Sequence, residues 1–388
     1  MDAVVIVSAT RTPLGAFNGK LKSLTAPELG SVVIGNVVKP VQGNVCAAYM
    51  GCVLSAGLGQ SAARQAAIGA GLNYAVNCIN INKICGSSMS AIMLAASAIS
   101  IGDAEVVVAG GMESMTNAPY LLGKARFGYR FGDAELVDHM VRDGLQDAYE
   151  KCLMGEYAED AAEIYHFSRE EQDEYALNSF LKARDAQKNG YFRREIIPVA
   201  SMEKKTEIIV EDDEIPFSVD LEKSKSLKPA FRPGGTITAA SASAIADGAA
   251  ALLLMKESKA RKLGLTPMAR IVAGSTFSQS PKLFATAPIG AIKKVLEKSG
   301  WQIDDVDLVE INEAFAVVPL AVMREFSMDP AKVNIFGGAC ALGHPLGVSG
   351  ARIVVTLLNA LKISKVKRGL AAICVGGGEG LAMTIEVG

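Results

Sequence analysis

The segment INKICGSSMSAIMLAASAISIGDAEVVVAGGMES, residues 81–114, contains the pattern that decides the fold. A strand-like run ends at Ile84, a small polar group follows, and an apolar, alanine-rich run extends to Ile101. Gly102 marks the end of that predicted helix, and residues 105–114 predict a strand that ends in a glycine turn. Because a helix without a polar face is a buried helix, this segment predicts a helix packed between two layers of an α/β protein.

The same order of elements returns near the C-terminus. The run GVSGARIVVTLLNAL, residues 347–361, predicts a second apolar helix, and LAAICVGGGEG, residues 370–380, predicts a strand that ends in a glycine turn. Further strands are predicted at Ala3–Ser8, Ala269–Gly274 and Asp307–Ile311, the first of them as a parallel strand covered on both faces. The simplest account is two similar α/β halves whose apolar helices share a middle layer.

The middle of the chain is more polar and more irregular than its two ends. It contains an amphipathic helix that is announced by a capping box, Ser168 with Glu171, and that closes near Gly190. We therefore predict three units. They are a first half made of residues 1–117 and 245–267, an inserted loop domain of residues 118–244, and a second half of residues 268–388.

Composition and charge exclude several kinds of protein. The net charge of −2 over 388 residues gives no polybasic surface for nucleic acid or an anionic membrane. We identify no apolar run long enough to span a bilayer, and the chain starts as a strand rather than an export signal. The seven cysteines have no zinc-finger or CxxC spacing, which predicts reduced thiols and a cytoplasmic location.

Cys85 is a candidate nucleophile. A buried free cysteine is usually a structural residue. Cys85, however, follows a strand-like run and comes directly before a helix, where unpaired backbone N–H groups and the helix dipole favour a thiolate. Gly86 would allow a substrate to approach the backbone closely. The position therefore predicts a reactive thiol.

Three further residues could act with this thiol. His344 lies in GGACALGHPLGVSGAR, residues 337–352, a glycine-rich run without a phosphate-binding motif, and could take a thiol proton. Cys374 and Asn312 follow predicted strands, whose carboxyl ends bind ligands in parallel sheets, although Asn312 could equally be a helix N-cap. One thiol with a histidine permits acyl transfer through a thioester. A second thiol is useful if a second proton must be moved, for instance from carbon.

Taken together, these motifs resemble the thiolase family across essentially the whole chain. The resemblance rests on the following segments, which occur in the family's order: VIVSATRTPLGAFNG (5–19), NKICGSSMSAI (82–92), VVVAGGMESMTNAPY (106–120), SREEQDEYA (168–176), TITAASASAIADGAAALLL (236–254), NEAFA (312–316), GGACALGHPLGVSGARI (337–353) and CVGGGEGLAM (374–383).

The resemblance implies a fold and a set of catalytic roles. Thiolases have five layers, α/β/α/β/α, with two similar halves and an inserted loop domain. Cys85 matches the nucleophile that becomes acylated, His344 the histidine that activates it, and Cys374 the cysteine that moves the proton at the α-carbon. His344 and Asn312, the latter through a water, match one oxyanion hole. The backbone N–H groups of Cys85 and Gly376 match the other.

Coenzyme A is implied as a substrate and product rather than a resident cofactor, and no metal is required. Ser243 matches the serine that contacts the pantetheine arm. By their position, four basic residues are candidates for the coenzyme A phosphates, namely Arg232, Lys228, Lys223 and Lys225. The resemblance also implies a homo-oligomer, either a dimer or a tetramer.

The implied reaction is a reversible Claisen condensation of acetyl-CoA with an acyl-CoA, with acetyl as the expected acyl group. Leu153, Phe336 and Glu379 depart from the short-chain pattern of the family, so chain length and branching stay open. Within the family, a degradative 3-ketoacyl-CoA thiolase of fatty-acid oxidation fits the same residues. Three other classes fit the sequence less well. Cys374 argues against a decarboxylating ketoacyl synthase, which uses Cys–His–His or Cys–His–Asn, and a Cys–His hydrolase would not need Cys374. The four filled catalytic positions argue against a catalytically inactive homologue that acts as a binding partner.

Overall fold

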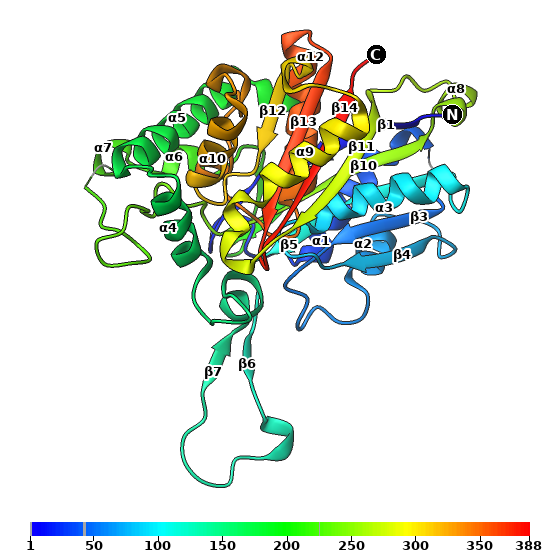
Figure 1. Cartoon of the computed structure of the whole chain (residues 1–388). Helices are drawn as coiled ribbons and strands as arrows, with labels where there is room; N and C mark the ends of the chain where they lie inside the picture. The colour runs from blue at the N-terminus through cyan, green and yellow to red at the C-terminus, as the bar shows by residue number, and fades with distance from the viewer. Residues whose placement is uncertain (1, 42–43, 225) are drawn as a thin grey trace.

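The structure is a computed structural model that describes residues 2–41, 44–224 and 226–388 (Figure 1). The strands in these residues are β1 Val4–Arg11, β2 Gly15–Ala16, β3 Ala47–Gly51, β4 Asn77–Ile81, β5 Val106–Ser114, β6 Tyr120–Leu122, β7 Leu136–Asp138, β8 Val199–Glu203, β9 Thr206–Val210, β10 Ala246–Lys256, β11 Ala269–Ser278, β12 Leu308–Ile311, β13 Arg368–Val375 and β14 Glu379–Glu386. The α-helices are α1 Ala26–Val37, α2 Ala62–Gly69, α3 Ser87–Ile101, α4 Met154–Ile164, α5 Arg169–Lys188, α6 Ile215–Ser218, α7 Leu221–Ser224, α8 Glu257–Lys262, α9 Ala287–Ser299, α10 Val317–Phe326, α11 Ala339–Leu342 and α12 Ser349–Ser364.

The strands of the two halves follow the same order. In the first half the order is β4-β3-β5-β10-β1, and in the second it is β12-β13-β14-β11, with Val333 bridged to the free side of β12. In both halves the parallel pairs come first, and an antiparallel pair follows, β5 with β10 and β13 with β14. The prediction of two similar α/β halves is confirmed.

The two halves meet at β1 and β11, which pair antiparallel over only two residue pairs, Val5 with Arg270 and Ile6 with Ala269. On its other side β1 is antiparallel to β10. The prediction that Ala3–Ser8 forms a parallel strand is therefore wrong. A continuous apolar run indicates that a strand is covered on both faces, and it does not indicate the direction of its neighbours.

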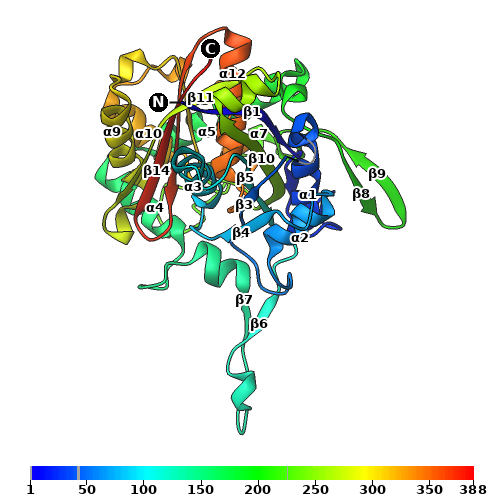
Figure 2. The ribbon, with the colours of Figure 1, turned by 90° about the vertical axis from the view of Figure 1, so that its right-hand side faces the viewer.

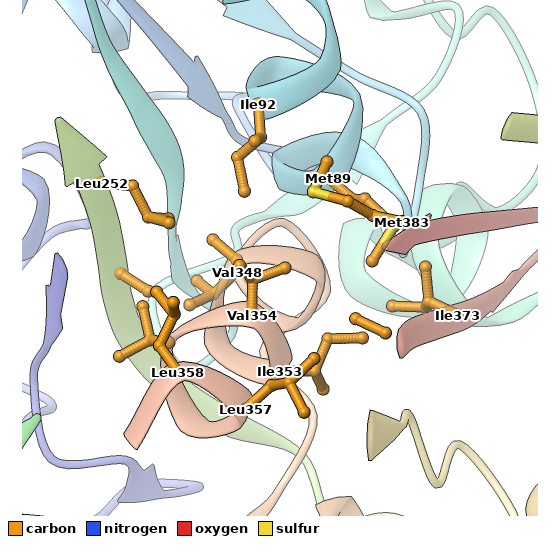
Figure 3. Close-up of a cluster of buried hydrophobic side chains, with 14 of the residues drawn as sticks. Met89, Ile92, Leu252, Val348, Ile353, Val354, Leu357, Leu358, Ile373 and Met383 are labelled. Carbon is orange, nitrogen blue, oxygen red and sulfur yellow. The ribbon is translucent and has the colours of Figure 1, made fainter. Parts of the chain in front are cut away.

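Helices cover both faces of each half and give five layers. Helices α1 and α2 pack on one side of the first half, and α9 and α10 pack on the outer side of the second. Helices α3 and α12 lie between the halves (Figures 1 and 2). Figure 3 shows side chains of this middle layer, in which Met89 and Ile92 of α3 and the apolar residues of α12 meet Leu252 of β10 and Met383 of β14.

The two apolar helices differ in how deeply they are buried. Helix α12 is buried over nearly its whole length, as predicted. Helix α3 is buried on one side only, and its Leu94 and Ile101 are 51% and 74% exposed. The stretch Ile84–Ile101 is long and apolar enough, by length and composition, to cross a membrane, contrary to our interpretation of the sequence. About 50% of this stretch is buried inside the protein, which is typical of a core helix.

The segment between β5 and β10 adds two hairpins and several helices. The capping box of α5 is confirmed, since the Ser168 N–H donates to Glu171 and the Glu171 N–H donates to the Ser168 hydroxyl. The β6–β7 hairpin extends away from the body, and β8–β9 forms a second hairpin on another side (Figure 2). The bounds that we gave for the three units stay a prediction.

Candidate active site

The five residues predicted for catalysis come from separate segments. Cys85 lies between β4 and α3, Asn312 directly follows β12, and His344 lies in the loop between α11 and α12. Cys374 is in β13, and Gly376 begins the turn between β13 and β14. The two halves thus contribute one and four of these residues, respectively.

A cavity of about 230 Å³ with mostly apolar walls lies where the two halves and the inserted segment meet. It brings together Cys85, His344, Gly376 and Ser243. The remaining lining residues are Ile84, Gly144, Leu145, Leu153, Met154, Gly155, Phe231, Ala242, Ile245, Phe284, Ala314, Phe315 and Leu346.

Cys85 is buried and is not primed as a thiolate. Burial raises the pKa of the Cys85 thiol to about 12, although the backbone N–H groups of Gly376 and Cys85 lower it by donating to the sulfur. Our argument that the helix N-terminus favours the thiolate is therefore wrong for the unliganded protein, since desolvation outweighs the backbone donors. Both N–H groups point toward the Cys85 sulfur, and their role in an oxyanion hole stays a prediction.

His344 is held as a neutral imidazole with a defined tautomer. Its Nδ1 lies 2.5 Å from the Ser349 hydroxyl oxygen, and that hydroxyl donates to the Pro345 carbonyl at 3.1 Å. Because the Ser349 proton is already used, Nδ1–H is the donor and Nε2 has a free lone pair. Burial, together with the positive charge of Arg352, lowers the pKa of His344 to about 3. At neutral pH, His344 can therefore accept a proton at Nε2.

Asn312 and Cys374 complete the group. The Asn312 side-chain Nδ2 lies 3.5 Å from His344 Nε2, so the predicted pair is in contact. Cys374 is 1% exposed, and burial together with the nearby Cys85 raises the pKa of its thiol well above the ordinary value. The two sulfurs are therefore close enough to influence one another, and Cys374 is a neutral thiol at rest.

The predicted coenzyme A contacts are only partly brought to the cavity. Ser243 lines it, held by a hydrogen bond from its N–H to the Ala314 carbonyl at 2.9 Å. Arg232 instead forms ion pairs with Asp160 and Glu163, so its charge is already balanced. The basic residues of the neighbouring segment are not drawn into the cavity: Lys228 and Lys223 are exposed, and Lys225 lies outside the described residues. The phosphate contacts stay a prediction.

The two departures from the short-chain pattern at Leu153 and Phe336 have different locations. Leu153 lines the cavity, where it adds to the apolar wall. Phe336 instead packs in the core, with its ring centroid 5.3 Å from that of Tyr191 and 6.1 Å from that of Phe192. Phe336 therefore bears on packing rather than on the acyl group.

Two residues of the site were missed from the sequence. They are Ser349, which fixes the tautomer of His344, and Glu113, a buried carboxylate beside the His344 loop. The spacing of Ser349, five residues after His344 and at the start of a helix, could have suggested a contact. For Glu113 the useful signal was an acidic residue within an otherwise apolar strand.

All seven cysteines are free thiols in the structure. Among the residues that the structure describes, no group of three or more His, Cys, Asp and Glu side chains is arranged to hold a metal ion. The cavity wall itself offers the Cys85 thiol, the His344 imidazole and backbone donors. Asn312 and Cys374 do not line the cavity but lie directly behind it, in contact with His344 and close to Cys85, respectively.

Comparison with known proteins agrees with this arrangement. Residues 4–258 match the model of the thiolase N-terminal domain, and residues 265–387 match that of the thiolase C-terminal domain. An acetyl-CoA acetyltransferase of Cupriavidus necator is 49% identical, with full coverage of both chains.

Two solved structures have nearly the same fold. The acetyl-CoA acetyltransferase of Bacillus anthracis has a TM-score of 0.97 at 43% identity and covers 100% of this chain and 99% of that one. A thiolase of Ascaris suum in complex with coenzyme A has a TM-score of 0.94 at 43% identity, with 99% and 100% coverage. With both family models matched in chain order and relatives covered from end to end, the chain belongs to the thiolase family.

Proposed function

We propose that this thiolase is an acetyl-CoA acetyltransferase, which joins two molecules of acetyl-CoA into acetoacetyl-CoA and free coenzyme A and also catalyses the reverse cleavage. The observation that carries the proposal is that Cys85 from the first half and His344 from the second line one cavity, with Cys374 close enough to Cys85 for the two thiols to interact electrostatically. The Cupriavidus necator and Bacillus anthracis relatives, which match over essentially their full length, are acetyl-CoA acetyltransferases, and this supports the choice of acetyl as the acyl group.

In the first half-reaction, Cys85 is the nucleophile. His344 Nε2 takes the thiol proton as the sulfur attacks the carbonyl carbon of acetyl-CoA, and the N–H groups of Cys85 and Gly376 bind the oxygen that becomes negative. Both Cys85 and His344 are neutral at rest, so the charged pair forms only when the bound thioester and these donors stabilise it. Cys374 then gives its proton to the departing sulfur of coenzyme A, which leaves an acetyl group on Cys85.

In the second half-reaction, the Cys374 thiolate removes a proton from the methyl carbon of a second acetyl-CoA. The enolate oxygen is stabilised by His344 and Asn312, whose side chains lie within 3.5 Å of each other. The enolate carbon attacks the acetyl carbon on Cys85, acetoacetyl-CoA forms, and the Cys85 sulfur leaves and recovers the proton held by His344. Both thiols are then protonated again: Cys85 has its own proton back, and Cys374 carries the methyl proton in place of the one that left with coenzyme A.

The test is coenzyme A-dependent cleavage of acetoacetyl-CoA beside 3-ketoacyl-CoA substrates of six to ten carbons, with Cys85→Ala as the control. We expect the four-carbon substrate to be cleaved fastest and the control to be inactive. A preference for longer chains would move the protein to the degradative branch, which the apolar Leu153 wall would suit. Cleavage of none of them by the folded protein would overturn the proposal.

We further propose that the protein works as a homo-oligomer in the cytoplasm, in fatty acid metabolism. Two separate apolar surfaces support self-association. One is formed by the outer side of α3, with Leu94 and Ile101, next to the edge strand β4, where Ile79 is 42% exposed. The other is the β6–β7 hairpin, which extends from the body (Figure 1) and exposes Phe127 and Phe131.

Two distinct surfaces, each paired with its own copy, give a tetramer built from two dimers. Native mass spectrometry of the wild type is expected to show this tetramer. A charge introduced on either apolar surface should break the tetramer at that surface. Phe131→Asp should leave a dimer, and Leu94→Asp should disrupt the contact at α3 and the edge strand β4. A monomeric wild type at micromolar concentration would contradict this part of the proposal.

A further inference from the structure

Glu113 is a fully buried carboxylate whose partners are backbone groups. It lies near the end of β5 and is 0% exposed. Its Oε2 accepts from the N–H groups of Val53 at 3.0 Å and Gly347 at 2.8 Å, and its Oε1 accepts from the Leu54 N–H at 3.1 Å. The Cys52 thiol donates to Oε1 as well. In the part of the chain that the structure describes, no lysine, arginine or histidine forms an ion pair with this carboxylate.

These donors belong to two loops that are far apart in sequence. Residues 52–54 follow β3, and residues 343–348 connect α11 to α12 and carry His344. Buried backbone N–H groups require acceptors, and neither loop has a strand or helix neighbour at these positions to supply them. One carboxylate therefore satisfies both loops and joins them.

The loop that carries His344 is packed so closely against its neighbours that it cannot shift without breaking the hydrogen bond from Gly347 to Glu113. A Cβ on Gly347 would lie 2.7 Å from Glu113 Oε2. The Gly347 carbonyl oxygen in turn lies so near β3 and β5 that a Cβ on Gly51 or Gly111 would be 2.6 Å or 2.0 Å from it. Only glycine fits at these three positions, because the backbones of three segments touch.

The position of the imidazole depends on two anchors of this loop. At one end the His344 N–H donates to the Ala244 carbonyl at 2.9 Å, and at the other the Gly347 N–H donates to Glu113. The ring itself is fixed by Ser349, which follows the same loop. A movement at Gly347 would therefore move the imidazole relative to Cys85, which belongs to the other half of the molecule.

We propose that Glu113 is a positioning residue, whose carboxylate bridges the Cys52–Leu54 loop and the His344 loop and so sets His344 at the distance from Cys85 that proton transfer needs. The inference rests on the proposed role of His344 as the base that activates Cys85. It assigns a catalytic consequence to a residue that touches neither substrate nor the reacting sulfur.

Glu113→Gln separates positioning from a simple charge effect, because the two predict opposite results. The negative charge of Glu113 raises the pKa of the Cys85 thiol, so its removal alone would make Cys85 more reactive. A glutamine, however, turns an NH₂ group toward one of the loops, which must then move. Since a misplacement of about 1 Å can cost about 100-fold in rate, we expect Cys85 to react at least about tenfold more slowly.

The measurement is the rate constant for alkylation of Cys85 by iodoacetamide at pH 7 to 9, followed by mass spectrometry of the peptide that contains it. A loss of folded protein lowers the amplitude of the folded-state phase and leaves its rate constant unchanged, so a simple loss of stability does not imitate the expected fall. The fall in kcat for acetoacetyl-CoA cleavage should match the fall in this rate constant, with KM within about twofold of the wild-type value.

Glu159→Gln is the matched control. Glu159 is also buried, at 2% exposure, and accepts from the backbone N–H groups of Thr236 at 2.8 Å and Ile237 at 2.9 Å. It holds a loop of the inserted segment and not the His344 loop, so the alkylation rate of Cys85 should stay at the wild-type value. A fall in this control equal to that of Glu113→Gln would overturn the inference.

If Glu113→Gln does not fold, Glu113→Asp replaces it, since a carboxylate shorter by one methylene cannot reach both loops. The same fall is expected. An unchanged or faster alkylation of Cys85 in either folded variant would overturn the inference. Wild-type protein that is not acetylated on Cys85 by acetyl-CoA would instead overturn the proposed function, so the two failures can be told apart.

Discussion

The two halves of the molecule share one strand order, yet their equivalent central strands end differently. Residues 110–113 and 376–379 both read as two glycines, one further residue and a glutamate. In the first half these residues are still part of β5, paired with β10 as far as Ser114. In the second half Gly377 and Gly378, with φ of 87° and 86°, form a turn, and β14 starts at Glu379.

The length of the link between the paired strands explains this difference. Residues 115–245 connect β5 to β10, whereas residues 376–378 connect β13 to β14. The long link lets β5 continue inward, where it places the Glu113 carboxylate under the His344 loop. The tight turn instead presents the Gly376 N–H to Cys85. The equivalent strands of the two halves therefore end in different functional groups: a carboxylate in the first half and a backbone N–H donor in the second.

The largest effect should come from separating the two thiols, one from each half. Cys85→Ala removes the nucleophile, so both acetylation of the protein and condensation should fall by at least about 10⁴-fold. Cys374→Ala should abolish condensation to a similar extent. Cys85 should still be acetylated, though more slowly, because water can replace Cys374 as the proton donor to the departing coenzyme A. Incubation with labelled acetyl-CoA, followed by mass measurement of the intact protein, distinguishes the two.

If Cys374→Ala condensed acetyl-CoA at the wild-type rate, the second half-reaction would need no thiol. A water or another base would then remove the proton from the methyl carbon. An absence of the acetyl mark in both variants, with a mark in the wild type, would show that water cannot replace Cys374 as the proton donor of the first half-reaction. The nucleophile of the first structural half and the proton carrier of the second would then act in the same half-reaction and could not be assigned separate roles.

The next effect concerns stability and tests the buried glutamate of the first half. Burial raises the pKa of Glu113 to about 7 from an ordinary 4.5. Between these values the folded protein holds a proton that the unfolded chain has lost, so the free energy of unfolding should fall as pH rises. The slope reaches about −1.4 kcal/mol per pH unit at most.

Glu113→Gln cannot titrate and should lack this contribution. Urea unfolding from pH 5 to pH 8 measures both curves, and subtracting one from the other cancels the opposite contribution of His344, whose pKa is lowered. The free energy of unfolding of the wild type minus that of Glu113→Gln should fall as pH rises to about 7 and stay constant above that pH. Parallel curves over the whole range would contradict a raised pKa for Glu113.

Much of this arrangement was predictable because local patterns determine it. The apolar runs gave α3, α12 and β5, and the capping box gave the start of α5, since each depends on residues a few positions apart. The candidate catalytic positions were identified because short, mostly glycine-rich motifs carry them, and their catalytic roles stay a prediction. The family resemblance then supplied the five layers, which no single segment indicates.

The remainder depends on contacts between distant segments. The sequence of β1 resembles that of a parallel strand because its apolar composition reflects burial on both faces. The direction of the neighbouring strands does not affect that composition. Helix α3 has the same apolar composition as α12 although one of its faces is exposed, because composition alone does not distinguish a buried apolar face from an exposed one. The high pKa of Cys85 arises from burial by residues of both halves, which the helix N-terminus alone could not indicate.

The smallest effect should come from the glutamate of the second half. Glu379 forms an ion pair with Lys83, two residues before Cys85, and so joins the nucleophile loop to the turn that carries Gly376. Both side chains are about one-third exposed, at 33% and 30%, so solvent screens the pair and limits its contribution to about 0–1 kcal/mol. Lys83→Glu and Glu379→Lys should each lower kcat by about two- to fivefold with little change in KM.

Reversal of both charges is the sharper test, because it restores the attraction while changing both residues. The double variant should recover kcat to within about twofold of the wild type, and the single variants should differ less from it in about 0.5 M salt, where screening is stronger. Recovery would mean that charge holds the N–H groups of Cys85 and Gly376, the proposed oxyanion-hole donors, together across the two halves. Single variants as active as the wild type would mean instead that packing of Gly86 against Val375 and Leu381, which leaves no room for a Cβ, already fixes the turn against the nucleophile loop.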